Sequence, residues 1–246
     1  MAMKIYLGII FFFYSFFSGA QTIDRLNTAR NCLYMTPAER EMIYELNVLR
    51  TKPEVYIRYL MPMLNDAKNE LKKNGRGQRN YSVTYSQTSL NGKNLGSIDT
   101  TWNFENEEAM KAIRSLIRDL RELRKLSILQ PDSGIYNAAK KHAADENAHD
   151  WKLLHTGSDG SQPWDRIKKF SPSMSSGNEN IAGRYGYATS TPRDIVIQLL
   201  IDAGIPGYGH RYNMLDPLWT FVACRTEKYR SRGDWWIQDF GVKKNK

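Results

Sequence analysis

The sequence predicts an α+β fold in which helices are layered against one small sheet, and three observations predict it. Apolar residues at helical spacing, preceded by N-capping residues, predict several helices before residue 150. Two short aromatic and β-branched runs, 219–225 and 235–240, flank turn residues 231–234 and predict an antiparallel hairpin. A further helix over 192–203 lies between these two groups. Helices before the strands and a helix close to them favour a mixed layered fold.

The first twenty residues predict a secretory signal peptide. Lys4 precedes a largely apolar run of 13 residues over 5–17, and small residues lead to a cleavage point between Ala20 and Gln21. A membrane-spanning helix needs about 20 apolar residues, and no later segment approaches that length. We therefore expect a secreted or periplasmic protein without a transmembrane segment in its mature form.

The first helices are indicated by their caps. Thr36 as N-cap, Pro37 at the first position and Glu39 as the partner of a capping box predict a helix start. A second helix restarts at Pro53, and Pro62 is expected to end or kink it. Between 72 and 101 glycines and small polar residues replace the apolar period, which predicts a loop or short hairpin insertion.

A basic helix is predicted over 106–126. Arg114, Arg118, Arg121 and Lys125 share one face of it, opposite an apolar face. This basic face is either an ordinary solvated surface or a contact for an anionic partner. Around these elements we expect an N-terminal extension over 21–35, one domain over 36–242 and a basic tail over 243–246.

Two later helices carry further capping signals. Asp132 is expected to cap a helix on which His142, Glu146 and His149 project in one direction. These three side chains form either a metal site or an ordinary pair of packed or surface histidines. Thr191 repeats the capping logic of Thr36 before the helix over 192–203.

Charge and cysteine content limit the function classes. The formal net charge is +9, which favours anionic partners. We found no phosphate-binding loop, dinucleotide fingerprint or nucleophile elbow, so kinase, dehydrogenase and serine-hydrolase activities are excluded. No nucleic-acid partner is expected. Cys32 and Cys224 are the chain's two cysteines, and they form either one disulfide in an oxidising compartment or two separate thiols.

Three polar groups beside glycines occur in the last ninety residues. They are His155-Thr-Gly, Gly177-Asn-Glu179-Asn180 and Gly209-His210-Arg211. Polar groups beside glycine typically line a cleft, and the elements between these groups mean that only tertiary folding brings them together. We expect them to form one site.

The order of these motifs resembles the bacterial branch of the CAP superfamily, also called the SCP-like extracellular domain. The resemblance covers about 37–241 and is carried by several motifs: Tyr44-Glu-Leu-Asn47, His155-Thr-Gly-Ser-Asp-Gly160, Glu179-Asn180-Ile181-Ala182, Gly209-His210-Arg211 and Trp236-Ile-Gln-Asp-Phe240-Gly241. It implies a three-layer α-β-α sandwich with a small central antiparallel sheet. It also implies a secreted protein, often without a known enzymatic activity.

The resemblance implies a divalent-cation site, commonly for zinc. His155 and His210 match the family histidines, and Glu179 matches the acid of the Glu-Asn motif. The fourth residue, a glutamate in the family, corresponds to Asp202 or, less directly, to Asp194.

Three functions remain open from the sequence. The first is a cation-binding domain for an extracellular or envelope ligand (lipid, glycan or peptide), with no catalysis assumed. The second is a metal-dependent hydrolase of peptide or envelope polymer, in which Glu179 serves as general base. The third is a binding module for lipid, sterol or anionic glycan, which the basic helix and the tryptophans would form.

Overall fold

The structure is a computed structural model that describes residues 25–77, 79–90, 93–149, 154–185, 190–228 and 233–243. The predicted signal peptide and Lys244, Asn245 and Lys246 of the basic tail lie outside these described residues.

The central sheet has the strand order β3-β5-β6-β4. Strands β5 (Phe221–Lys228) and β6 (Gly233–Lys243) form the predicted antiparallel hairpin. Strand β4 (Met174–Tyr185) pairs with β6 in antiparallel register, with Glu179 opposite Asp239. The short strand β3 (Gln130–Pro131) pairs with β5 in parallel, so the sheet is antiparallel except at this edge.

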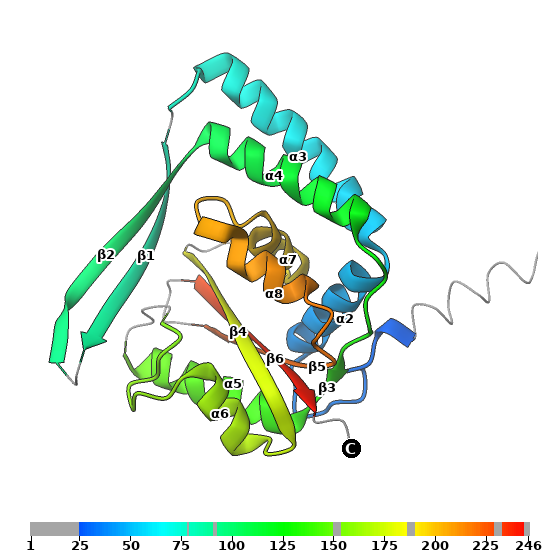
Figure 1. Cartoon of the computed structure of the whole chain (residues 1–246), viewed down its shortest axis with the longest axis vertical. Coiled ribbons are helices and arrows are strands. Elements are labelled where there is room, and N and C mark those ends of the chain that lie inside the picture. Colours follow the sequence, from blue (N-terminus) through cyan, green and yellow to red (C-terminus); the bar gives the residue numbers. More distant parts are fainter. Residues whose placement is uncertain are drawn as a thin grey trace, which may run out of the picture.

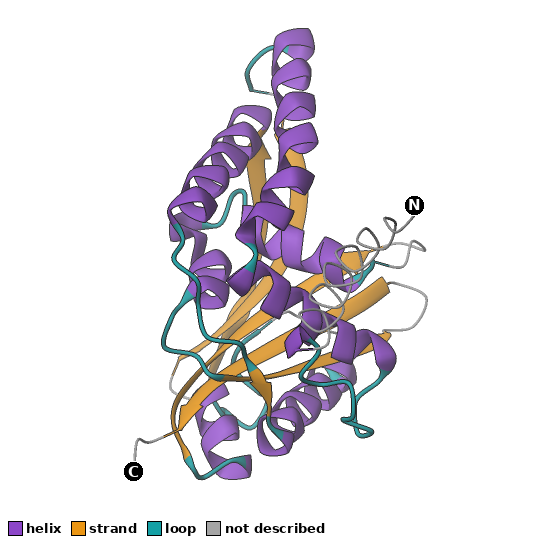
Figure 2. Cartoon of the chain, turned by 90° about the vertical axis from the view of Figure 1, so that its right-hand side faces the viewer, coloured by secondary structure: helices purple, strands orange, loops and turns teal. Residues whose placement is uncertain are grey.

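Helices cover both faces of the sheet, as Figures 1 and 2 show. On one face lie α5 (Ser133–Ala148) and α6 (Pro163–Phe170). On the other face lie α2 (Pro37–Thr51), α7 (Pro192–Ile201) and α8 (Gly209–Leu215), with the 3-10 turn η1 (Pro206–Tyr208) before α8. The predicted three-layer α-β-α sandwich is confirmed.

The side chains between the layers explain why the helices stay in place. Trp235 and Ile237 alternate along β6 toward α5, where Ala139 and Ala143 permit close approach. Trp236 and Phe240 point to the other side and join the larger core that includes Met42 of α2. Trp219, Trp235 and Trp236 are all buried, in agreement with a core role.

The predicted helix caps are present. The Thr36 hydroxyl accepts from the Glu39 amide at 3.3 Å, and the Glu39 carboxylate accepts from the Thr36 amide at 2.7 Å. Asp132 accepts from the first amides of α5, and Thr191 with Asp194 forms a second capping box at α7. These local bonds satisfy amides that have no partner within the helix.

Two further helices and a hairpin extend past the sheet (Figure 1). Helix α3 (Pro53–Asn74) continues through Pro62 to Asn74, with Gly75 as its C-cap. The alternative in which Pro62 ends the helix is therefore wrong. Strands β1 (Arg79–Leu90) and β2 (Lys93–Glu105) form a separate two-stranded sheet, which confirms the hairpin alternative with bounds later than expected. Helix α4 (Asn106–Glu122) then returns alongside α3.

Helix α4 ends four residues earlier than predicted. Its last residue is Glu122, and the Leu126 amide donates to the Arg50 carbonyl at 3.0 Å instead of to a helical partner. Lys125 therefore follows the helix and does not lie on its basic face.

The disulfide alternative is not realised in the structure. Both Cys32 and Cys224 are free thiols. Cys224 is fully buried in β5, where burial raises the pKa of its thiol well above the ordinary value, whereas Cys32 is only partly buried before α2. Each packs against the main core from its own element.

Candidate functional site

His155 and Glu179 form the first pair of the candidate site. The Nδ1 atom of His155 lies 2.9 Å from Oε1 of Glu179. Glu179 lies near the middle of β4 and its side chain is fully buried, whereas 47% of the His155 side chain is exposed. The pair thus joins a buried carboxylate to an imidazole ring that is partly exposed to solvent.

The other oxygen of Glu179 is held by Arg166, which the sequence did not assign to the site. Nη2 of Arg166 donates to Oε2 of Glu179 at 2.9 Å and to the His155 carbonyl at 3.0 Å. Nη1 donates to the Ser161 carbonyl at 2.7 Å. Asp165, the neighbour of Arg166 in the sequence, instead accepts from the Gln162 amide at the start of α6.

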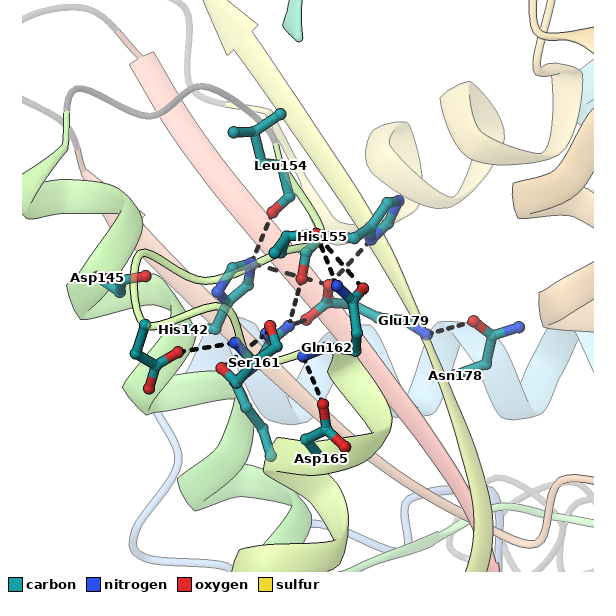
Figure 3. A network of polar contacts seen from close by, with 12 residues as sticks. His142, Asp145, Leu154, His155, Ser161, Gln162, Asp165, Asn178 and Glu179 are labelled. Carbon is teal, nitrogen blue, oxygen red and sulfur yellow. Dashed lines mark hydrogen bonds and ion pairs between the residues drawn. The ribbon is translucent and has the colours of Figure 1, made fainter. Parts of the chain in front are cut away.

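His142 of α5 lies on the other side of the same carboxylate (Figure 3). Its Nε2 atom is 2.8 Å from the Leu154 carbonyl and 3.8 Å from Oε1 of Glu179. Burial lowers the pKa of His142, although the neighbouring Glu179 works against this. A neutral ring therefore donates Nε2–H to Leu154 and fixes the backbone just before His155.

Asp239 is a second buried acid beside Glu179, and it was not predicted. It stands opposite Glu179 in the β4–β6 register and is fully buried, and its side chain shares a hydrogen bond with Glu179. Burial, together with the charge of Glu179, raises the pKa of Asp239 well above its ordinary value. Burial also acts to raise the pKa of Glu179, but the His155 hydrogen bond and the nearby cationic groups lower it overall. Asp239 therefore keeps its proton while Glu179 carries the charge.

His210 and Asp202 form a second pair. The Nδ1 atom of His210 lies 2.8 Å from Oδ1 of Asp202, and the His210 amide donates to Oδ2 at 3.0 Å. Asp202 is the C-cap of α7 with φ of 53°, a left-handed conformation that turns the chain so that its carboxylate meets the start of α8. Asp194, the other acid considered from the sequence, instead caps the start of α7.

The two pairs lie beside consecutive residues of β4. Asn180, next to Glu179, donates from Nδ2 to the His210 carbonyl at 3.2 Å and to Gln238 at 3.1 Å. Adjacent strand residues point to opposite faces, so the two pairs approach β4 from different sides. Because β4 is the last strand in the sheet order, no further strand separates these two sides along its outer edge. Within the described ranges, no three His, Cys, Asp or Glu side chains converge in a way that could hold a metal ion.

The other predicted histidine group is not assembled. His142 points to Glu179 and Glu146 is buried, whereas His149 is exposed and its Nδ1 atom contacts the Asp145 carbonyl at 2.8 Å. The three side chains therefore do not meet, which corrects their interpretation as one metal site. The position of His142 beside Glu179 has no local sequence signal, since it depends on how α5 packs on the sheet.

A surface groove lies away from both pairs. It is lined in part by Asn27, Pro37, Arg40 and Tyr44, where the N-terminal segment meets α2. The candidate site residues do not line this groove.

Comparison with known proteins identifies the family. The model of the cysteine-rich secretory protein family, CAP, matches residues 114–240, which is more than half of the 246-residue chain. The chain belongs to the CAP family. The match includes both histidine–carboxylate pairs, strands β4 and β5, and most of β6. The predicted family resemblance is thereby confirmed.

Solved structures and curated proteins were compared with this CAP chain as well. An outer surface protein from Borrelia burgdorferi is 23% identical over 56% of this chain and 95% of its own, with a TM-score of 0.39. An extracellular protein with an SCP domain from Bacillus anthracis is 14% identical over 72% of this chain and 71% of its own, with a TM-score of 0.38. The search of curated proteins gave no match. In the described part of the chain, no helix has the length and apolar character needed to cross a membrane.

Proposed function

We propose that this CAP domain binds a divalent cation, zinc by preference, through His155 and His210. Glu179 and Asp202 would hold the two rings, and the cation site would take an extracellular or envelope ligand. The proposal includes no catalytic turnover. The observation that carries it is that each histidine is held through Nδ1 by a buried carboxylate.

Carboxylate–histidine pairs are typical of metal sites. A ligating histidine commonly donates one ring N–H to a carboxylate, which fixes the tautomer and leaves the other nitrogen for the metal. His155 and His210 both make this contact through Nδ1, at 2.9 and 2.8 Å, so Nε2 is the atom each ring offers. Imidazole nitrogen suits zinc. The carboxylates then act as supports, and the two rings supply the nitrogen ligands.

The local framework also supports the proposal. Arg166 donates a hydrogen bond to the Glu179 carboxylate, and Asn180 donates one to the His210 carbonyl. The side chains of both histidines remain accessible, at 47% for His155 and 22% for His210. A cation with two protein nitrogens would keep positions for water or for a ligand carboxylate or phosphate.

Calorimetric titration of zinc into the protein, purified without a chelator or a histidine tag, tests this function. We expect binding heat from the wild type, loss of at least about tenfold in affinity for either His155→Ala or His210→Ala, and wild-type binding for His149→Ala. The His149→Ala variant controls for weak zinc binding to exposed histidines. Equal binding by the wild type and the His155→Ala, His210→Ala double variant would contradict the proposal.

The position of Glu179 is the reason why the proposal includes no catalytic turnover. Glu179, the general base of the hydrolase hypothesis, has a fully buried side chain with one oxygen on His155 and the other on Arg166. A general base must reach the proton that it abstracts, directly or through one water. In this arrangement Glu179 orients the His155 ring and balances the positive charge of the buried Arg166 side chain.

We further propose that the protein is exported. Support comes from the signal-like residues 1–20 and from membership of the cysteine-rich secretory protein family. The expected result of intact-mass analysis on protein from the native cell envelope or medium is a chain that begins at Gln21. A chain that retains Met1 and remains in the cytoplasm would contradict export.

A further inference from the structure

The outward side of α4 and the segment after it carry a row of cations, which we call the α4 row. All six members are exposed: Lys111, Arg114, Arg118, Arg121, Arg124 and Lys125. The opposite side of α4 is buried against the core, including Ile113, Leu116 and Leu120. Because the apolar side is fully used for packing, the row faces solvent and is not needed to hold the helix in place.

The acids near the α4 row are largely engaged elsewhere. Asp119 accepts from the buried Arg211 at 3.0 Å, and its contact with Arg118 is a longer 3.5 Å. Glu107 lies 3.9 Å from Arg76 as well as 3.5 Å from Lys111. Glu122 is the exposed acid within the row. The surface therefore keeps a strong positive excess.

The spacing of these cations along α4 destabilises the helix. Like charges three or four residues apart on a helix repel each other, and Lys111, Arg114, Arg118 and Arg121 follow this spacing. For Arg114, Arg121, Arg124 and Lys125, no ion pair is recorded within the described part of the chain, and Arg114 contacts only the Met110 sulfur, at 3.8 Å. An ordinary solvated face usually alternates charges and avoids this repulsion.

The chemistry of the row favours phosphate groups. Four of the six cations are arginines, whose planar guanidinium binds phosphate through two parallel hydrogen bonds. The helical part of the row extends about 15 Å, so several phosphates have to be engaged together. Among the described residues, the large exposed hydrophobic side chains lie outside α4, which leaves no aromatic platform for nucleic-acid bases or sugars there.

We propose that the α4 row docks the protein on a membrane surface rich in anionic phospholipid headgroups. The flat array of lipid phosphates lets several of these cations act at once, and the contact is electrostatic, without insertion of apolar side chains. Helix α4, which carries most of this surface, runs alongside α3 (Figures 1 and 2). The row includes neither His155 nor His210. It is therefore independent of the proposed cation site.

Vesicle flotation with the purified full-length mature protein tests this proposal. One set of vesicles contains phosphatidylcholine alone, and in the other about one lipid in three is phosphatidylglycerol. We expect flotation with the anionic vesicles only, and a loss of at least about tenfold in affinity when salt rises from about 0.05 to about 0.5 M. Equal binding to both vesicle types, or binding that salt leaves unchanged, would overturn the proposal.

Charge variants locate the surface. The Arg114→Glu, Arg118→Glu, Arg121→Glu variant should bind anionic vesicles about a hundredfold more weakly. A matched control, Lys140→Glu, Lys168→Glu, Lys169→Glu, makes the same charge change at exposed sites on α5 and α6 and should retain binding within about threefold. The glutamine versions of the three α4 substitutions, checked by circular dichroism, keep the test valid if the reversal impairs folding. Retained binding by the folded α4 variants, or binding to soluble polyphosphate without binding to vesicles, refutes membrane docking.

Discussion

At the scale of single residues, charge is unequally divided between two neighbouring carboxyl groups. Glu179 and Asp239 are both fully buried and stand opposite each other, yet Arg166 contacts only Glu179. The lowered pKa of Glu179 and the raised pKa of Asp239 assign the negative charge of the pair to Glu179 and the proton to Asp239. Two adjacent buried carboxyl groups can carry one negative charge between them, but not two.

Amide substitutions distinguish the two acids. Glu179→Gln should lower the free energy of unfolding by about 3 kcal/mol or more, because it leaves Arg166 buried without a counter-charge. Asp239→Asn should change it by less than about 1 kcal/mol, because a neutral acid is replaced by a neutral amide of the same shape. Urea unfolding at pH 7 measures both. A larger loss for Asp239→Asn than for Glu179→Gln would reverse the charge assignment.

Asp145 gives a pH-dependent prediction outside the candidate site. Its oxygens accept from the Ser158 amide at 2.7 Å and from the Ser158 hydroxyl, and these bonds lower the pKa of Asp145 although partial burial acts to raise it. A carboxylate with a depressed folded-state pKa stabilises the fold above its unfolded pKa of about 4 and loses this effect as pH falls through the folded value. Thermal unfolding should therefore show Asp145→Asn melting a few degrees below wild type at pH 7, with a smaller gap below pH of about 4. A gap that stays constant or widens on acidification would contradict this role.

The sequence predicted only part of the residue-scale site. His155, Glu179, His210 and Asp202 were recognisable, because histidines and acids beside glycines or within a family motif have a local signal. Arg166 and Asp239 were not, and His142 was assigned to a different cluster, because their roles depend on which strand and helix faces meet. An aspartate within the aromatic strand over 235–240 was the one hint that a buried acid lies in the sheet.

At the scale of elements, β4 shows how tertiary pairing overrides local pattern. Its sequence is rich in Ser, Gly and Asn, and it lacks the alternation of apolar residues that predicts strands. It is nonetheless a strand of 12 residues, because it pairs along most of its length with the apolar strand β6. Helices with capping residues, in contrast, were predictable because their start signals are local.

Gly183 of β4 lies in close contact with the Trp235 ring, which leaves no room for a side chain at this position. A Cβ added at Gly183 would lie 1.8 Å from the ring of Trp235, its partner on β6. Gly183→Ala should therefore destabilise the fold by about 3 kcal/mol or more, since the buried ring has to move. Gly209→Ala is the matched control, because a Cβ there meets no atom within 4 Å. Urea unfolding of the two variants checks the contrast, and near-equal stability would mean that Trp235 does not pack on Gly183.

At the scale of the whole molecule, the β1–β2 hairpin is separable from the sandwich. Its strands pair with each other in a sheet of their own, apart from the four-stranded sheet. The ends of the helices that carry it lie close together, as the Asn106 side chain donates to the Gly75 carbonyl at 2.7 Å. We propose that 36–242 forms one domain with this hairpin as an insertion.

Replacement of residues 79–105 by a short Gly-Ser linker tests this organisation. The shortened protein should still unfold in one cooperative transition, because the sandwich core and its caps remain. Its zinc affinity should match that of the full chain, since His155 and His210 are held by Glu179 and Asp202, which lie outside the hairpin. Loss of cooperative unfolding would show that the hairpin belongs to the core.

The central claim is that His155 and His210 together supply nitrogen ligands to one cation. X-ray absorption at the zinc edge on the protein loaded with one equivalent of zinc tests it most directly. We predict imidazole scattering from two histidines at about 2.0 to 2.1 Å, with oxygen completing the shell and one imidazole lost in either His→Ala variant. A shell of oxygen or sulfur without imidazole, or a spectrum unchanged in both variants, would contradict the account.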